Sequence, residues 1–229
     1  MPVARRASAA NDLLAALPRK SFLGLSSWLK PVDLKFGEVL FERGESIRHV
    51  YFPGNAMVSL LTDGERRAVE VGLVGHEGMV GISLALGVNV SPVRALVQGA
   101  GAAMRMDRAR FLAEFRRNAL LQQGLYRYGH ALMAQITQIS ACNRLHTVQM
   151  RLARWLLMTR DRVLSDEFVL THEFLGHMLG VRRVGVTGAA GALQRDDLIT
   201  YSRGNIRILD QKGLETAACR CYKIVKNLH

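Results

Sequence analysis

The spacing of apolar residues divides this chain into two parts. Residues 32–106 consist of short valine-rich runs separated by glycine-containing turns at intervals of roughly 8–12 residues. Such runs are typical of the strands of an antiparallel sandwich or barrel-like roll. From about residue 107 the apolar positions follow a helical period, which short strand-like runs interrupt only near the C-terminus. The pattern therefore predicts an α+β chain with an antiparallel β-roll in its N-terminal half.

The predicted roll follows a helical lead-in over residues 11–30. Asp63-Gly64 lies between two strand-like runs and is the clearest hairpin turn. We expect strands in the segments VDLKF, GEVLF, HVYFP, MVSLL, RAVEVGLV, MVGISLAL, VRALVQ and AAMRM.

A long helix is predicted over residues 118–145, after a short one at 107–117. Apolar residues spaced close to 3.5 along the long helix are typical of a helix paired with a copy of itself. The alternative is a helix that packs on its own β domain, and both can hold on different faces. The residues of this predicted dimer interface are Leu121, Leu125, Leu132, Ile136 and Ile139.

Residues 171–194 read as two short helices joined by a tight turn. Thr171 is a plausible N-cap, Gly180 can end the first helix in a left-handed conformation, and Arg183 stands near the start of the second. We expect Val184 and Leu193, with Val186 as a further candidate, to face the first helix. The pattern matches a helix-turn-helix, whose second helix enters the DNA major groove, although an αα-hairpin in a core remains the alternative.

The segments around these helices predict a winged helix. Residues 148–163 and 211–226 have helical periods, residues 166–170 can form a strand, and DDLITYSRGNIRILD predicts a β-hairpin with its tip near Gly204. Side chains at the tip and at the start of the second helix could donate hydrogen bonds to phosphates and bases. The candidate DNA-binding residues are Thr171, Arg182, Arg183, Thr187, Ser202 and Arg203.

Charge and composition favour this interpretation. The 229 residues carry a formal net charge of +12, which indicates a polyanionic partner such as a nucleic acid or an anionic membrane surface. No apolar run is long enough to cross a membrane, and the N-terminus lacks the apolar core of a secretory signal. The three cysteines are odd in number and are not spaced as in a disulfide framework, which fits a reducing compartment. We therefore expect a cytoplasmic protein.

Catalytic and metal-binding patterns are weak. His172 and His177 flank a glutamate, but a spacing of five residues places them about 140° apart on a helix, unlike the histidines of zinc proteases. Successive residues of the run Cys219-Arg220-Cys221 would alternate in direction on a strand, and on a helix the two cysteines would diverge by roughly 200°, so we expect no metal clamp from this pair. We therefore expect neither an enzyme nor a metal site.

Several motifs together resemble the Crp/Fnr family of bacterial transcription regulators over nearly the full length. They are FGEVLFERGE, VYFP with Gly54, RLARWLL, LTHEFLGHMLGVRR, LITYSRGNIRILD and LETAACRCY. The resemblance implies an effector-sensing roll like those that bind cyclic nucleotides (1–117), a dimerisation helix (118–146) and a winged helix-turn-helix (147–229). It further implies a homodimer on a two-fold-symmetric site in double-stranded DNA, with RNA polymerase as a further partner. The alternative is a ligand-binding roll that acts through protein interactions without DNA binding.

The chain departs from this family in the effector pocket. Members that bind cyclic nucleotides use a Gly-Glu pair for the ribose and Arg-Ser or Arg-Thr for the phosphate. Gly81 is followed here by Ile82, and Arg94 stands where the Ser or Thr belongs. We therefore expect weak or no cAMP binding, and control by another signal or by no ligand. The candidate pocket residues are Gly81, Ile82, Arg94, Ile136 and Thr137.

Two further departures concern cofactors and DNA sequence. The iron–sulfur members carry N-terminal cysteines, but no cysteine precedes Cys142. A haem site is left open, because His49, His76 and His130 could serve as axial ligands. In the second helix only Arg183 matches the family's base-reading residues, since Val184 and Gly188 replace the other two. The target sequence is therefore expected to differ from the family's usual site.

Overall fold

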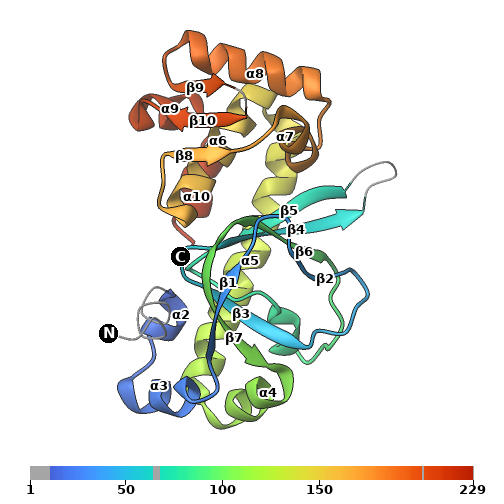
Figure 1. Ribbon diagram of the computed structural model, residues 1–229, viewed down its shortest axis with the longest axis vertical. Coiled ribbons are helices and arrows are strands. Elements are labelled where there is room, and N and C mark those ends of the chain that lie inside the picture. Colours follow the sequence, from blue (N-terminus) through green and yellow to red (C-terminus); the bar gives the residue numbers. More distant parts are fainter. Residues whose placement is uncertain (1–10, 64–67, 203, 229) are drawn as a thin grey trace. The chain divides into compact units, whose positions relative to one another are not determined.

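The computed structural model describes residues 11–63, 68–202 and 204–228. Contacts divide the chain into two compact units, Met1–Leu61 with Leu73–Met133 and Thr62–Gly72 with Ala134–His229. The predicted α+β fold is confirmed, with the roll in the first unit and the winged helix in the second (Figure 1). Within the described residues, no helix has both the length and the apolar character needed to span a membrane.

Two antiparallel sheets form the roll. One has the order β1 (Lys30–Leu34), β7 (Gly101–Asp107) and β3 (His49–Pro53). The other has the order β2 (Val39–Phe41), β6 (Arg94–Gly99), β4 (Met57–Asp63) and β5 (Ala68–Val74). Strand residues turned inward fill the space between the sheets, so the valine-rich runs become a packed core. Its fully or almost fully buried members include Val50, Phe52, Met57, Val58, Val97 and Met104.

One predicted strand is wrong. The segment MVGISLAL forms only a bridge between Val80 and Tyr51, followed by the 3-10 helix η1 (Ile82–Leu84). Gly81 has a φ of +98°, which ends the extended backbone and which other residues rarely adopt. The predicted Asp63-Gly64 turn lies partly outside the described residues, because Gly64 is not among them.

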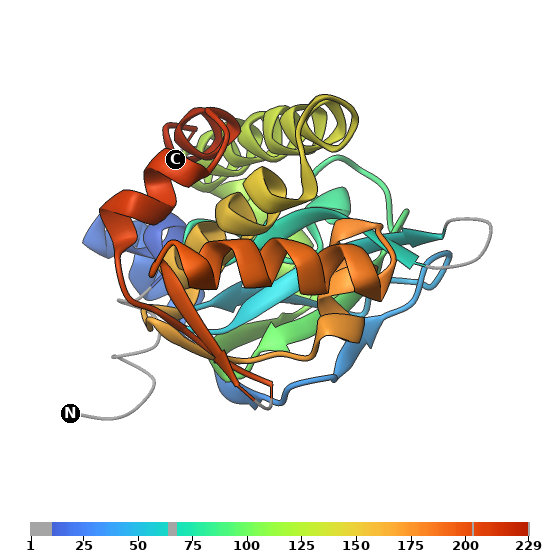
Figure 2. The ribbon, with the colours of Figure 1, turned by 90° about the horizontal axis from the view of Figure 1, so that it is seen from above.

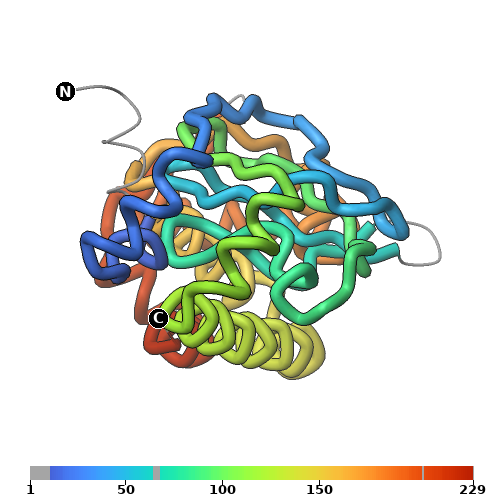
Figure 3. Tube along the Cα trace, turned by 90° about the horizontal axis from the view of Figure 1, so that it is seen from below, coloured from blue at the N-terminus to red at the C-terminus, as the bar shows by residue number. Residues whose placement is uncertain are grey.

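Among the described residues, four α-helices accompany the roll: α2 (Asp12–Ala15), α3 (Arg19–Ser26), α4 (Arg108–Arg117) and the start of α5 (Ala119–Leu145). Figure 3 follows the chain from the roll through α4 into α5. The side chains of Asn11, Asp107 and Asn118 each accept a hydrogen bond from a backbone N–H at the start of α2, α4 and α5. These caps satisfy donors that a helix leaves free, so local sequence sets where each helix begins.

The long helix packs against its own chain with one face. Leu121, Leu125, Leu132 and Ile139 are no more than 5% exposed in the single chain, so they have little surface left for a partner. This agrees with the alternative that the stripe packs on the protomer itself. The side of α5 that remains exposed is a different one and includes the apolar residues Leu120, Tyr126, Met133 and Leu145.

Close packing of the roll on α5 depends on Gly78. A Cβ at this position would lie 2.3 Å from Cε2 of Tyr128, which is itself buried. We therefore expect Gly78→Ala to destabilise the fold by about 1–3 kcal/mol through overpacking. Urea unfolding measures this change.

Gly124 on α5 provides the matched control. A Cβ at Gly124 would meet nothing within 4 Å, so Gly124→Ala should raise stability by up to about 1 kcal/mol through helix propensity alone. Equal effects of the two substitutions would contradict the packing argument.

The second unit is built around α6 (Val148–Val163), which carries Trp155 and other fully buried side chains. A sheet of order β8 (Glu167–Val169), β10 (Asn205–Ile208) and β9 (Ile199–Ser202) and the helices α7 (His172–Leu179) and α8 (Arg183–Arg195) complete the predicted winged helix. The β4–β5 segment of this unit also contacts α6, because the indole N–H of Trp155 donates to Glu70 over 2.9 Å.

The single C-terminal helix predicted over 211–226 is wrong. The chain forms α9 (Gln211–Ala217) and α10 (Cys221–Lys226) instead, with Ala218 in an extended conformation between them. Cys219, Cys221 and Tyr222 are each no more than 3% exposed. A continuous helix would turn Cys219 and Cys221 to diverging sides, whereas the break lets both be buried.

Candidate nucleic-acid interface

The helix-turn-helix begins and ends as its sequence predicts. Thr171 caps α7, since its hydroxyl oxygen accepts a hydrogen bond from the N–H of Phe174 over 3.1 Å. Gly180 ends α7 in the left-handed conformation with a φ of +62°. At Gly176 a Cβ would lie 3.0 Å from the carbonyl oxygen of Val181, so a glycine lets the turn fold tightly against α7.

Arg151 of α6 holds the end of α7 in place. Its guanidinium donates to the carbonyl of Leu179 at the C-terminus of α7, where free carbonyls favour a cation. Arg151 is buried, and this burial lowers its pKa from the usual value. The first helix of the motif is therefore fixed to α6 by a charge-assisted hydrogen bond as well as by apolar packing.

The second helix, α8, divides into a buried and an exposed side. Val186, Ala189, Ala190 and Leu193 are buried, whereas Arg182, Arg183, Val184, Thr187 and Gly188 are exposed at its N-terminal end. Figure 2 looks onto α8, which lies nearest the viewer, with the strands of the wing beside it.

The prediction that Val184 packs toward the first helix is wrong, because Val184 is 75% exposed. Since α8 begins at Arg183, Val186 rather than Val184 points inward. The predicted inward position of Leu193 is consistent with its complete burial. The exposed end of α8 therefore presents two guanidinium groups and an apolar side chain together.

Thr187 and His172 connect the recognition helix to the rest of the domain. The Thr187 hydroxyl donates to the carbonyl of Arg183 over 3.1 Å and lies 3.0 Å from Nδ1 of His172. The His172 ring stacks on Tyr201 of the wing, with centroids 4.1 Å apart. Burial and then the charge of Arg183 lower the pKa of His172, which favours a neutral imidazole. Sequence reasoning missed this link, because His172 and Tyr201 belong to no common motif.

The wing is the predicted hairpin. Ser202 pairs with Asn205 at its end, Gly204 has a φ of +88°, and the Ser202 side chain is exposed. Arg203, predicted to contact DNA, lies outside the described residues. The Tyr201 hydroxyl donates to the carbonyl of Leu170 over 3.3 Å, which joins the wing to the segment before α7.

The predicted effector residues lie on different elements and differ in exposure. Gly81 and Ile82 lie at the start of η1, and Arg94 forms an ion pair of 2.9 Å with Glu42 on the surface of the roll. Ile136 is half-buried and Thr137 is exposed on α5. Whether these five residues share a ligand site stays a prediction.

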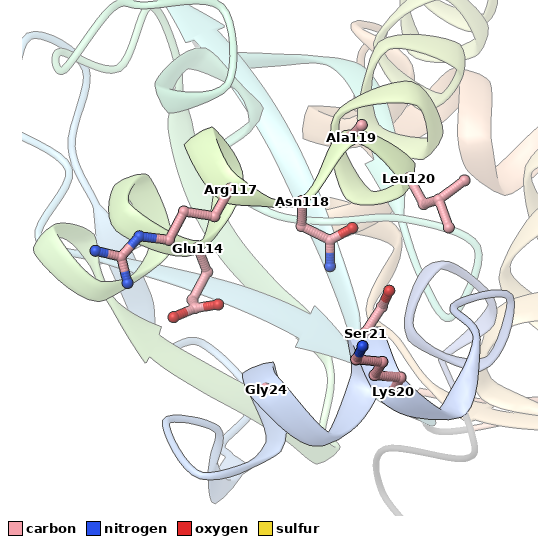
Figure 4. Close-up of a pocket in the computed structure, with 8 residues that line it drawn as sticks. All are labelled: Lys20, Ser21, Gly24, Glu114, Arg117, Asn118, Ala119 and Leu120. Atoms are coloured by element: carbon pink, nitrogen blue, oxygen red, sulfur yellow. The ribbon is translucent and has the colours of Figure 1, made fainter.

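A pocket of about 440 Å³ lies elsewhere in the first unit, between α3 and the junction of α4 and α5. In Figure 4 the side chain of Asn118 points toward Ser21 and Lys20 of α3. Because Asn118 already caps α5 and none of the predicted effector residues lines this pocket, it does not correspond to the predicted site.

The histidines and cysteines also have defined partners. Nδ1 of His76 lies 2.9 Å from a carboxylate oxygen of Asp12, and burial lowers the pKa of His49. Cys142, His146, Cys219 and Cys221 gather in one group of potential metal ligands. The prediction from the sequence rested on the C-terminal pair of cysteines alone, so this group was missed. The four-residue spacing of Cys142 and His146, which puts both on one side of a helix, could have indicated it.

Comparisons with known proteins agree with this geometry. Residues 150–217 match the family model described as the Crp-like helix-turn-helix domain. A search of curated protein sequences finds no match.

Solved structures are similar over most of the chain. A protein described as a Crp/Fnr transcriptional regulator from Eubacterium rectale is 18% identical, with 90% of this chain and 97% of that chain covered and a TM-score of 0.68. FixK2 from Bradyrhizobium japonicum is 13% identical, with coverage of 83% and 98% and a TM-score of 0.70. A protein described as a cAMP-binding regulator from Silicibacter pomeroyi is 22% identical, with coverage of 94% and 98% and a TM-score of 0.62.

The fold and the helix-turn-helix thus agree with the resemblance that the sequence motifs predicted. These relatives are described as regulators and not as enzymes. Residues 150–217 form a Crp-like helix-turn-helix domain, and the chain has the fold of the Crp/Fnr family of transcription regulators.

Proposed function

We propose that this protein is a transcription regulator of the Crp/Fnr type that binds double-stranded DNA as a homodimer. One observation supports this most strongly. The N-terminal end of α8 presents Arg182, Arg183 and Val184 to solvent, while the opposite side of the helix is buried in the domain. A helix held in this way can enter the major groove with its N-terminal residues toward the bases.

The exposed side chains divide between base reading and backbone contact. The Arg183 guanidinium can donate two hydrogen bonds to O6 and N7 of a guanine, and the Val184 side chain can contact the methyl group of a thymine. Arg182, Thr171 and Ser202 carry donors suited to phosphate oxygens. The Thr187 hydroxyl already contacts His172 and the Arg183 carbonyl. Thr187 would therefore contact DNA mainly through its methyl group.

The homodimer would place two such helices on a two-fold-symmetric site. We assign the contact to the exposed side of α5, on which Tyr126, Met133 and Thr137 lie seven and four residues apart. This is the spacing of a helix paired with its copy. This side of α5 takes the place of most of the interface residues expected from the sequence, because Leu121, Leu125, Leu132 and Ile139 are buried within the protomer.

The controlling signal is proposed to differ from cAMP, or to be absent. The relative from Silicibacter pomeroyi is described as cAMP-binding, and another from Xanthomonas campestris as responsive to c-di-GMP. In this chain an apolar Ile82 follows Gly81, and the Arg94 guanidinium is paired with Glu42. Neither arrangement favours a ribose hydroxyl or a cyclic phosphate. Regulation would proceed in the cytoplasm with RNA polymerase as the further partner.

A mobility-shift experiment with pooled genomic fragments tests the proposal. We expect the purified protein to retard a subset of fragments, with an affinity that falls steeply as salt increases, because phosphate contacts release counterions. Competition with unrelated DNA separates specific from non-specific binding.

The absence of any shift at low salt, with and without cyclic nucleotides, would contradict the proposal. That result would favour a ligand-binding roll that acts through protein contacts.

A further inference from the structure

Four potential metal ligands meet in the second unit although they come from distant parts of the sequence. Cys142 and His146 lie one turn apart near the C-terminal end of α5. Cys219 lies in the break between α9 and α10, and Cys221 is the first residue of α10. The three sulfur atoms and one imidazole nitrogen all lie within 4.8 Å of one another.

The separations fit a tetrahedral ion. Zinc bonds of about 2.3 Å to sulfur and 2.0–2.1 Å to nitrogen place two sulfurs about 3.8 Å apart, and a sulfur and a nitrogen about 3.6 Å apart. The Sγ atoms of Cys142 and Cys219 are 3.4 Å apart, and Sγ of Cys221 lies 3.6 Å from Nδ1 of His146. Small side-chain shifts would complete the tetrahedron.

The surroundings suit a negatively charged centre. All three cysteines are buried, with Met150 packed against them, and the Gln138 amide donates to Sγ of Cys221 over 3.0 Å. Arg154 is 3% exposed, and its Nε has no hydrogen-bond partner among the described residues. A buried guanidinium requires a nearby negative charge, and thiolates would supply it.

The thiols already interact with each other and with this cation. The hydrogen bond from Cys142 is the main cause that lowers the pKa of Cys219 to about 5, and the charge of Arg154 contributes to the same shift. The same hydrogen bond, together with burial, raises the pKa of Cys142. Thiolates are the form that metals bind, so a thiol that is still protonated would lose its proton to the ion.

We propose that Cys142, His146, Cys219 and Cys221 bind one zinc ion in a closed Cys3His site. Zinc binding would form three Zn–S bonds and one Zn–N bond, with release of the protons held by the thiols that are still protonated. Four protein ligands leave no position for a substrate, so the ion is structural. It would tie the C-terminal end of α5 to α10, independently of whether the chain binds DNA.

The break between α9 and α10 makes this site possible. On one continuous helix Cys219 and Cys221 would point about 200° apart and could not share an ion. Here only Cys221 belongs to α10, and Ala218 before Cys219 is extended, so both sulfurs turn toward α5. The pattern that argued against a metal clamp therefore does not apply.

Metal analysis of the full-length protein tests the proposal. After reconstitution with zinc under reducing conditions and removal of free metal, we expect one zinc per chain. Cobalt in place of zinc should give the ligand-field bands of a tetrahedral ion together with thiolate charge-transfer absorption. In competition with a chromophoric chelator, Cys219→Ser and His146→Asn should each weaken zinc binding by more than about 100-fold, since even outer-shell changes cost 10–100-fold.

Matched variants control for indirect effects. His130→Asn removes an exposed histidine elsewhere on α5, and Met150→Leu alters packing beside the cysteines while every ligand stays. Both should keep one zinc. If a ligand variant fails to fold, the cobalt spectrum of the unmodified chain still decides.

Zinc well below one equivalent, or a cobalt spectrum without thiolate bands, would overturn the proposal. Bound iron with inorganic sulfide, or a Cys142–Cys219 disulfide in a zinc-free protein, would also overturn it.

Discussion

Met133→Glu should convert the homodimer to monomers and weaken binding to a two-fold-symmetric DNA site by about 100-fold or more. Met133 is 62% exposed on α5, on the same side as Tyr126 and Thr137. In a pair of helices this position would face its copy, so the substitution would bring two carboxylates together in an apolar contact. A monomer carries one recognition helix and loses the gain from binding two linked half-sites.

Light scattering measures the oligomeric state, and titration of a labelled fragment measures the affinity. Leu23→Glu is the matched control, because Leu23 is an apolar residue of α3 with 57% exposure that lies outside α5. It should leave both quantities unchanged. A Met133→Glu protein that remains dimeric would place the interface on another surface.

Arg183→Ala should remove most of the preference for the specific site, by about 1–3 kcal/mol or roughly 5–150-fold. Arg183 is exposed at the first turn of α8, which the packing of Val186 and Leu193 holds in place. Loss of a bidentate contact to a base weakens binding only to DNA that has this base at the contacted position. Binding to unrelated DNA, which depends on phosphate contacts, should fall much less.

Affinities for specific and unrelated DNA, measured over a range of salt concentrations, test this assignment. Arg182→Ala should weaken both affinities alike and reduce the salt slope by about one, as expected for a phosphate contact. Arg195→Ala, at the other end of α8, should have little effect on the preference. Equal loss of specific and non-specific binding by Arg183→Ala would show that Arg183 contacts phosphate.

Much of the architecture could be predicted from the sequence because it depends on local interactions. Thr171 and Gly180 bound α7 through a capping hydrogen bond and a left-handed backbone, which residue type alone indicates. The long helix and the wing hairpin likewise follow from apolar period and turn residues. The positive φ of Gly81, by contrast, could not be predicted from the sequence, because the residues around Gly81 are suited to a strand.

The sites depended more on contacts between distant residues. The spacing of the apolar residues showed that Leu121, Leu125 and Leu132 share one side of a helix. It did not show whether that side packs on the protomer itself or on a second copy, and their burial in the single chain decides this. Likewise, the sequence predicts that the Thr187 hydroxyl donates to DNA, whereas in the structure this hydroxyl contacts His172 and the Arg183 carbonyl. In each case the partner lies on another element or another turn.

By itself the sequence determined most of the order of the elements, the helix-turn-helix and its exposed Arg183, because these follow from residue type and spacing over a few turns. Only the tertiary structure decided which side of α5 is free, which face of α8 is buried, and that Cys142, His146, Cys219 and Cys221 meet. The physical reason is that burial and metal-ligand geometry arise from contacts between separate elements, such as those of Cys142 with Cys219 and of His146 with Cys221, which are 77 and 75 residues apart in the chain.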